Sequence, residues 1–228
     1  MNFRVVHIGS TGGGVLSRLL GHAWVRALSL EAVSDRACGT LDVARAAGLP
    51  AVQLDAADGL AFSDALAARY RGRDDLVFLS FYTRLFRGDF LQQHAGRIFN
   101  CHPALLPAFK GMRGFEDTLA SSSLFMGATL HQVDAEMDHG PAVIQVALPL
   151  DRSQPVADNR HRLFLAQVYS TLQFLRWLHD GRLQPAPQGA RLAGARFQPG
   201  IYAPGLDADL FDFLGVPNEL DPPEPAYP

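Results

Sequence analysis

Phe3-Arg4-Val5-Val6-His7-Ile8-Gly9-Ser10-Thr11-Gly12-Gly13-Gly14 is the stretch that decides the fold of this 228-residue chain. Its apolar, β-branched start predicts a buried strand over Phe3–Ile8, and the apolar residues after the glycines predict a helix over Val15–Leu28. A strand, a glycine loop and a helix open a βαβ unit, in which backbone N–H groups at the helix start attract an anion. The loop lacks both the lysine of a P-loop and the G-x-G-x-x-G spacing, so a tight turn without a ligand is the alternative.

Buried strands and helices alternate along the first hundred residues. Strands are predicted over Leu28–Ser34, Ala51–Leu54, Asp75–Ser80 and Arg97–Cys101, and helices over Leu41–Ala47, Phe62–Tyr70 and Phe90–His94. This alternation predicts an α/β fold with a parallel sheet covered on both faces. Asp35 ends the second strand, where a carboxylate either holds a ribose hydroxyl or, as is commoner, simply ends the strand.

The pattern changes after residue 102. A helix is predicted over Phe115–Ser122, two strands over Phe125–Val133 and Ala142–Leu150, and a long helix over Val156–His179. The short loop between the two strands predicts that they pair antiparallel. Beyond Leu183 the chain is rich in proline and glycine, which predicts an extended or disordered segment.

Composition narrows the classes of function. Apolar residues make up 48% of the chain and charged residues 19%, as in ordinary globular proteins. The net charge of −3 and the lack of a basic cluster argue against nucleic-acid binding. Cys38 and Cys101, the only two cysteines, provide neither a disulfide framework nor a metal motif. With no leader and no membrane-length apolar run, we expect a cytoplasmic protein without membrane or metal partners.

Three polar side chains in the second half suit acyl transfer. Asn100 and His102 stand two residues apart at the carboxyl end of a strand, so they share one face. Asp138 lies in the loop between the two later strands. An amide donor, a proton-carrying imidazole and an orienting carboxylate are the groups that acyl transfer requires. Cys101 points to the opposite face and is expected in the core, whereas His131 either packs on the sheet or faces the site.

Two longer motifs surround these residues. They read Phe99-Asn100-x-His102-Pro103-x-Leu105-Leu106-Pro107-x-Phe109-x-Gly111 and Gly127-Ala128-Thr129-x-His131-x-Val133-x4-Asp138-x-Gly140-Pro141-x3-Gln145. Together they resemble the formyltransferase family that uses 10-formyltetrahydrofolate, with the glycinamide ribonucleotide enzymes as the most similar branch. The resemblance covers residues 3–183 and is strongest over residues 76–150. It implies a Rossmann-like, mostly parallel twisted sheet with helices on both faces and an antiparallel strand pair after the strand of Asn100.

The resemblance also implies roles for individual residues. An amine attacks the formyl carbon on folate N10, Asn100 hydrogen-bonds the oxyanion, and His102 stabilises the charge and moves protons. Asp138 favours the charged form of that imidazole. The resemblance assigns binding of the folate co-substrate to Arg84, Leu85, Phe86, Val133, Asp134 and Glu136, and binding of the substrate phosphate to Gly12, Gly13 and Gly14. It further implies a cis peptide bond between Leu106 and Pro107.

The residues expected to bind the formyl acceptor differ from those of the glycinamide ribonucleotide enzymes. Those enzymes have Ser-Asn where this chain has Gly13-Gly14, and a substrate-contacting glutamate where it reads Leu165-Ala166-Gln167-Val168-Tyr169. Ala104 replaces their serine, and Phe81-Tyr82-Thr83 is bulkier. Glycinamide ribonucleotide is therefore the first acceptor to test, with an amino sugar nucleotide as another. Hydrolysis of the formyl folate and a non-catalytic folate-binding role are the further alternatives, and an oxidoreductase using a dinucleotide is remote.

These predictions define an expected domain organisation. Residues 1–183 form the catalytic domain, in which residues 1–99 face the substrate and residues 100–183 carry the folate site and catalysis. Residues 184–228 form a proline- and glycine-rich extension. The expected partners are a small amine and folate, bound by a monomer or homodimer.

Overall fold

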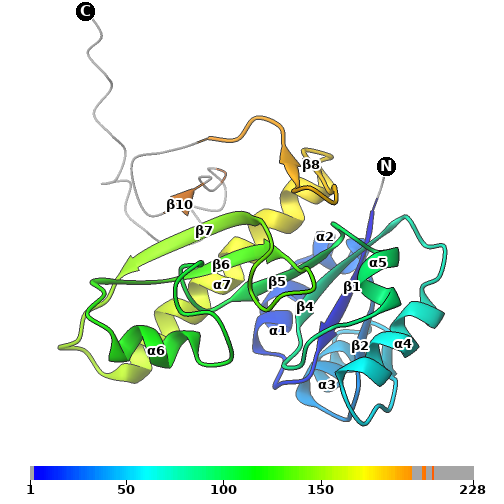
Figure 1. Ribbon diagram of the computed structural model, residues 1–228, viewed down its shortest axis with the longest axis horizontal. Helices are drawn as coiled ribbons and strands as arrows, with labels where there is room; N and C mark the ends of the chain where they lie inside the picture. The colour runs from blue at the N-terminus through cyan, green and yellow to red at the C-terminus, as the bar shows by residue number, and fades with distance from the viewer. Residues whose placement is uncertain (1–2, 197–201, 204–206, 208–228) are drawn as a thin grey trace, which may run out of the picture.

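The computed structural model describes residues 3–196, 202–203 and 207 of the chain (Figure 1). Its centre is an eight-stranded sheet in the order β10-β7-β6-β5-β4-β1-β2-β3. The strands are β1 (Arg4–Gly9), β2 (Ser29–Ser34), β3 (Ala51–Gln53), β4 (Leu76–Phe81), β5 (Ile98–His102), β6 (Phe125–Gln132), β7 (Ala142–Pro149) and β10 (Tyr202–Ala203). β1 to β5 run parallel, whereas β6 pairs antiparallel with β5 and β7. The predicted mixed sheet is confirmed.

Helices cover both faces of this sheet (Figure 1). They are α1 (Gly14–Leu20), α2 (Ala23–Leu28), α3 (Gly39–Ala46), α4 (Gly59–Arg69), α5 (Asp89–Gln93), α6 (Gly114–Ala120) and α7 (Val156–His179). Because successive side chains of a strand point to opposite faces, β1 contributes Val5 to one apolar core and Val6 to the other. The first core packs against α1, α2, α3 and α7, and the second against α4 and α5.

The single helix predicted over Val15–Leu28 is wrong, because the structure divides it. α1 ends at Leu20, and α2 begins only at Ala23. His22 between them is extended, with φ −92° and ψ 124°. Gly21 has a low helix propensity, and apolar spacing alone does not reveal such a break.

The order of the strands determines where a ligand can bind. From β1 the chain builds outward through β2 and β3 on one side and through β4 and β5 on the other. The loops that follow β1 and β4 therefore diverge at the carboxyl edge of the sheet and leave a crevice between them. The glycine loop and the end of β5, which carries Asn100 and His102, lie at this same edge.

Part of the segment beyond Leu183 is extended, which is one of the two predicted conformations. Strands β8 (Leu183–Gln184) and β9 (Arg191–Leu192) pair antiparallel, and β10 pairs with the outer edge of β7. Asp207 joins the fold through Arg182, whose Nη1 lies 3.0 Å from either carboxylate oxygen. Open edges of strands provide backbone partners that composition does not reveal. The remainder of the extension lies outside the described residues. No helix in the described part is long and apolar enough to span a bilayer.

Candidate active site

A cleft of about 550 Å³ opens at the carboxyl ends of β1, β4 and β5. Its wall includes every residue that the sequence assigned to catalysis or binding. These are Gly12, Gly13, Gly14, Arg84, Leu85, Phe86, Asn100, His102, Val133, Asp134, Glu136 and Asp138. Phe164 and Gln167 of α7 also line the cleft. The fold thus brings together residues that are far apart in the sequence.

His102 is at the centre of a short polar chain. Its ring is 3% exposed, and its Nδ1 lies 3.3 Å from Oδ2 of Asp138. Nε2 lies 2.8 Å from the carbonyl oxygen of Phe109. Asn100 precedes it on the same face of β5 and is partly exposed to the cleft. Two donors and a carboxylate therefore meet at one place, as acyl transfer requires.

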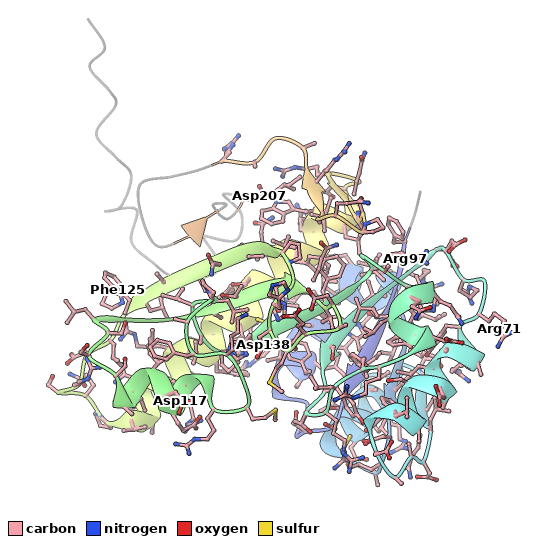
Figure 2. All side chains as sticks on the ribbon, in the orientation of Figure 1. Arg71, Arg97, Asp117, Phe125, Asp138 and Asp207 are labelled. Atoms are coloured by element: carbon pink, nitrogen blue, oxygen red, sulfur yellow. The ribbon has the colours of Figure 1, made fainter. Side chains whose placement is uncertain are left out.

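Asp138 lies in the loop between β6 and β7, near the centre of Figure 2. Its backbone has φ +50°, a left-handed conformation that aspartate tolerates better than most residues. Burial alone would raise the pKa of its carboxyl. The hydrogen bond to His131, that from the Gly111 N–H at 2.8 Å and the charge of His102 outweigh burial and hold this pKa below its usual value. Asp138 is therefore an anion at neutral pH.

His131, whose orientation the sequence left open, lines the cleft. It lies opposite Asn100 in the β5–β6 pair. Its Nε2 is 3.6 Å from Oδ1 of Asp138 and 3.5 Å from Nδ2 of Asn100. Its Nδ1 lies 2.8 Å from the Gln132 carbonyl, which only accepts, so this nitrogen carries the hydrogen. The register between β5 and β6 decides this contact, and no local pattern contains that register.

Cys101 lies on the opposite face, as predicted. It is 4% exposed and belongs to the core packed against α7. Burial raises the pKa of its thiol to about 12, so the reactive thiolate is absent at neutral pH. A role as nucleophile is therefore excluded for this residue.

The chain after β5 is held against the antiparallel pair. Thr129 Oγ1 donates to the Ala104 carbonyl at 2.8 Å and accepts from the Leu106 N–H at 3.1 Å. Gln145 Nε2 donates to the Leu106 carbonyl at 2.8 Å. The Leu106–Pro107 bond is cis, as the resemblance implied. These hydrogen bonds fix the path of residues 104–106 as the chain leaves the sheet after His102.

The acceptor side of the cleft lies between the glycine loop and α7. The Thr11 carbonyl accepts from both the backbone N–H and the hydroxyl of Thr40, which holds the loop against the start of α3. A Cβ at Gly14 would lie 3.4 Å from the ring of Phe164. Gln167 Nε2 donates to the Cys101 carbonyl at 3.1 Å. This side therefore presents backbone, an aromatic ring and a neutral amide.

Asp35 does not hold a ribose hydroxyl. Its side chain is fully buried, and both oxygens are already hydrogen-bonded, to Arg36, Tyr82 and Arg84. Metal-ligating side chains also fail to gather in the cleft. In the part of the chain that the structure describes, no group of three histidine, cysteine, aspartate or glutamate residues has a geometry that could hold a metal ion.

Comparison with known proteins identifies relatives. The model of the formyl transferase family matches residues 41–167. Phosphoribosylglycinamide formyltransferase of Mycobacterium tuberculosis is 36% identical over 151 residues, which cover 62% of this chain and 69% of that protein. The enzyme of the same name from Escherichia coli K12 is 30% identical over 129 residues, which cover 57% of this chain and 61% of that protein.

A solved structure agrees with these matches. Glycinamide ribonucleotide transformylase 1 from Symbiobacterium toebii superposes with a TM-score of 0.75 at 31% identity, over 84% of this chain and 94% of that one. The family model covers more than half of the 228 residues, and its range includes the strand of Asn100 and His102 and the loop of Asp138. The chain belongs to the formyl transferase family.

Proposed function

We propose that this protein transfers the formyl group of 10-formyltetrahydrofolate to the amine of glycinamide ribonucleotide. The observation that carries the proposal is the convergence of Asn100, His102 and Asp138 on one cleft, where Asp138 lies 3.3 Å from the His102 ring. The names of the relatives supply the transferred group and the first acceptor, and the resemblance supplies the folate donor.

In the proposed reaction the amine nitrogen attacks the formyl carbon and forms a tetrahedral intermediate. Asn100 Nδ2 donates to the oxyanion, and His102, paired with Asp138, places a positive charge beside it. The bond from the formyl carbon to N10 then breaks. The proton that the attacking nitrogen loses ends on N10, with His102 as its carrier, and leaves tetrahydrofolate and a formamide.

The folate is proposed to bind between two loops. One contains Arg84, Leu85 and Phe86, and the other contains Val133, Asp134 and Glu136. All of these residues line the cleft. Val133 N–H donates to the Ile98 carbonyl at 2.8 Å, which ties the start of the second loop to β5. Backbone groups held in this way suit recognition of the flat, polar edge of a pterin.

The acceptor phosphate is proposed to bind at Gly12, Gly13 and Gly14, where only backbone donors are available. A different primary amine is the second candidate acceptor, and two observations favour it. Phe164 packs on Gly14, and Gln167 presents a neutral amide where the resemblance places a glutamate. An amino sugar nucleotide is the first alternative to test.

We also propose residues 1–183 as the catalytic domain, divided near residue 99 into acceptor and donor halves, and residues 184–228 as an extension. A cytoplasmic monomer or homodimer with small-molecule partners fits this organisation. The expected partners do not include a metal, a nucleic acid or a membrane.

The test is turnover of 10-formyltetrahydrofolate followed by absorbance, with and without glycinamide ribonucleotide, beside the Asn100→Ala variant. Turnover that requires this amine and is lost in the variant is the expected result. Turnover with an amino sugar nucleotide alone would move the acceptor to the second candidate. Turnover without any amine would make the protein a hydrolase, and folate binding without turnover would make it a folate-binding protein.

A further inference from the structure

The loop between β4 and α5, residues 82–88, forms the donor side of the cleft and contains no helix or strand. Irregular backbone needs anchors from elsewhere in the fold if it is to present a fixed binding surface. Two side chains of this loop reach the same carboxylate. The Tyr82 hydroxyl and the Arg84 Nη1 each lie 2.9 Å from Oδ2 of Asp35.

Asp35 is a buried, ionised carboxylate that can hold the 82–88 loop in place. It follows the last residue of β2, and its side chain is fully buried. Burial would raise the pKa of its carboxyl, but the hydrogen bonds from Arg36 and Tyr82 and the charges of Arg36 and Arg84 hold that pKa below its usual value. A buried anion of this kind stays in place only while its partners remain, so carboxylate and loop restrain each other.

Tyr82 and Arg84, the two side chains bound to Asp35, themselves line the cleft. The Tyr82 ring stacks on the Phe86 ring, with centroids 5.3 Å apart and planes at 21°. Arg84 Nη1 also donates to the Ala57 carbonyl at 3.1 Å. Phe86 is 6% exposed and belongs to the second core. Asp35 therefore contacts one end of the proposed pterin wall directly, at Tyr82 and Arg84, and reaches the other end, Phe86, through the Tyr82 ring.

Two further polar contacts of the loop join uncharged groups. Thr83 contacts Ser10 through its backbone N–H at 3.2 Å and its hydroxyl at 2.9 Å. The Arg87 N–H donates to Ser63 Oγ at 3.0 Å. Hydrogen bonds to charged groups are the stronger class, so the contacts to Asp35 dominate the restraint.

We propose that Asp35 is a positioning residue for the formyl donor, acting through Tyr82 and Arg84 on the 82–88 loop. This inference rests on the proposed function, because it takes the wall of this loop as the folate side of the cleft. Asp35 itself does not touch the cleft, so its effect should appear in donor binding and not in chemistry or acceptor binding.

The first experiment compares Asp35→Asn with the wild type in steady-state kinetics. Loss of the charge-assisted hydrogen bonds should raise the KM for 10-formyltetrahydrofolate about tenfold, while kcat and the KM for the acceptor stay within about twofold. The matched control is Arg36→Gln, which removes an ion pair of the same carboxylate but leaves Tyr82 and Arg84 bound. Its kinetic constants should equal those of the wild type.

The second experiment asks whether Asp35 acts through the two loop residues. In a Tyr82→Phe/Arg84→Gln background, adding Asp35→Asn should change the donor KM no further. A further increase there, a wild-type donor KM in Asp35→Asn, or an equal loss in kcat would overturn the proposal. Thermal unfolding of each variant checks folding. If Asp35→Asn does not unfold cooperatively, Tyr82→Phe replaces it, and the donor KM alone should still rise.

Failure of this inference and failure of the proposed function are distinguishable. A wild-type protein that neither turns over nor binds the formyl folate contradicts the proposed function. A wild type that does both, together with an unchanged Asp35→Asn variant, contradicts only the role of Asp35.

Discussion

Oδ2 of Asp138 lies 3.3 Å from Nδ1 of His102, while the opposite ring nitrogen lies 2.8 Å from the Phe109 carbonyl oxygen. Carboxylate and carbonyl oxygens only accept hydrogen bonds. The Nε2 that faces the Phe109 carbonyl therefore carries a hydrogen. Asp138 places a negative charge beside the other ring nitrogen, which favours a positively charged ring when an oxyanion forms nearby.

Asp138→Asn should lower kcat by about 10²–10³ and leave binding of tetrahydrofolate nearly unchanged. The amide keeps the volume of the side chain but removes the charge that pairs with the His102 ring. Single-turnover rates and a folate titration measure the two quantities. Asp117→Asn, on the surface of α6, is the matched control (Figure 2). Near-normal turnover of the Asp138 variant would refute the role given to this carboxylate.

Asn100→Ala should lower kcat by about 10²–10³ because it removes the amide donor to the oxyanion. Asn100 Nδ2 lies 3.5 Å from His131 Nε2, and this contact orients the amide toward the cleft. His131→Gln should therefore also lower kcat, by a smaller factor. Turnover at saturating substrates gives both values. If the His131 variant loses more than the Asn100 variant, the order of the two roles is reversed.

Gly114→Ala should impair turnover although residue 114 has no reactive group. A Cβ there would lie 2.7 Å from Nε2 of His102 and 3.2 Å from Cβ of Ala104, closer than packed atoms allow. The ring must shift by several tenths of an ångström, and such misplacement slows a positioned reaction strongly. We expect a loss in kcat of at least about tenfold. Wild-type kcat in a folded Gly114→Ala protein would show that the His102 ring moves freely.

Gln167→Glu should raise kcat/KM for glycinamide ribonucleotide. The resemblance places a substrate-contacting glutamate in this region of the last helix, and Gln167 lines the cleft. A carboxylate there would accept from the amine and hydroxyl donors of that acceptor, whereas the present amide is bound to the Cys101 carbonyl. Kinetics with glycinamide ribonucleotide and an amino sugar nucleotide compare the two proteins. A lower kcat/KM for both acceptors would mean that the amide itself binds substrate.

His7 should make the protein less stable in mild acid. Its ring is 2% exposed, its Nε2 contacts Ser29 Oγ at 2.7 Å, and burial lowers its pKa from 6.5 to about 4. Between these two values the unfolded chain binds more protons than the native state, so the free energy of unfolding falls as pH falls from about 6.5 to about 4. The contribution of this one group reaches about 3 kcal/mol.

His7→Leu should flatten this dependence without abolishing it. Burial also lowers the pKa of His94 to about 4, so part of the slope remains. Urea unfolding at pH 7.5 and pH 5 measures the difference, and His161→Gln, on the exposed face of α7, is the control. An unchanged slope in His7→Leu would show that His7 is already protonated in the native state.

Every residue that the resemblance assigned to the site lines the cleft. Strand alternation correctly separated Asn100 and His102 from Cys101, because it depends on a period of two residues within one strand. The single helix over Val15–Leu28 was wrong, because the chain between α1 and α2 is extended at His22. The sequence left the orientation of His131 open, and the register between β5 and β6 decided it.

The sequence by itself determined the order of strands and helices, the strand end that carries Asn100 and His102, and the family motifs, because these are patterns of neighbouring residues. Only the tertiary structure decided that His131 joins Asp138 beside the amide and imidazole of β5, and that the Asp35 side chain contacts Tyr82 and Arg84. Contacts between residues some 30 to 50 positions apart depend on strand register and loop closure, and these follow from packing the whole sheet.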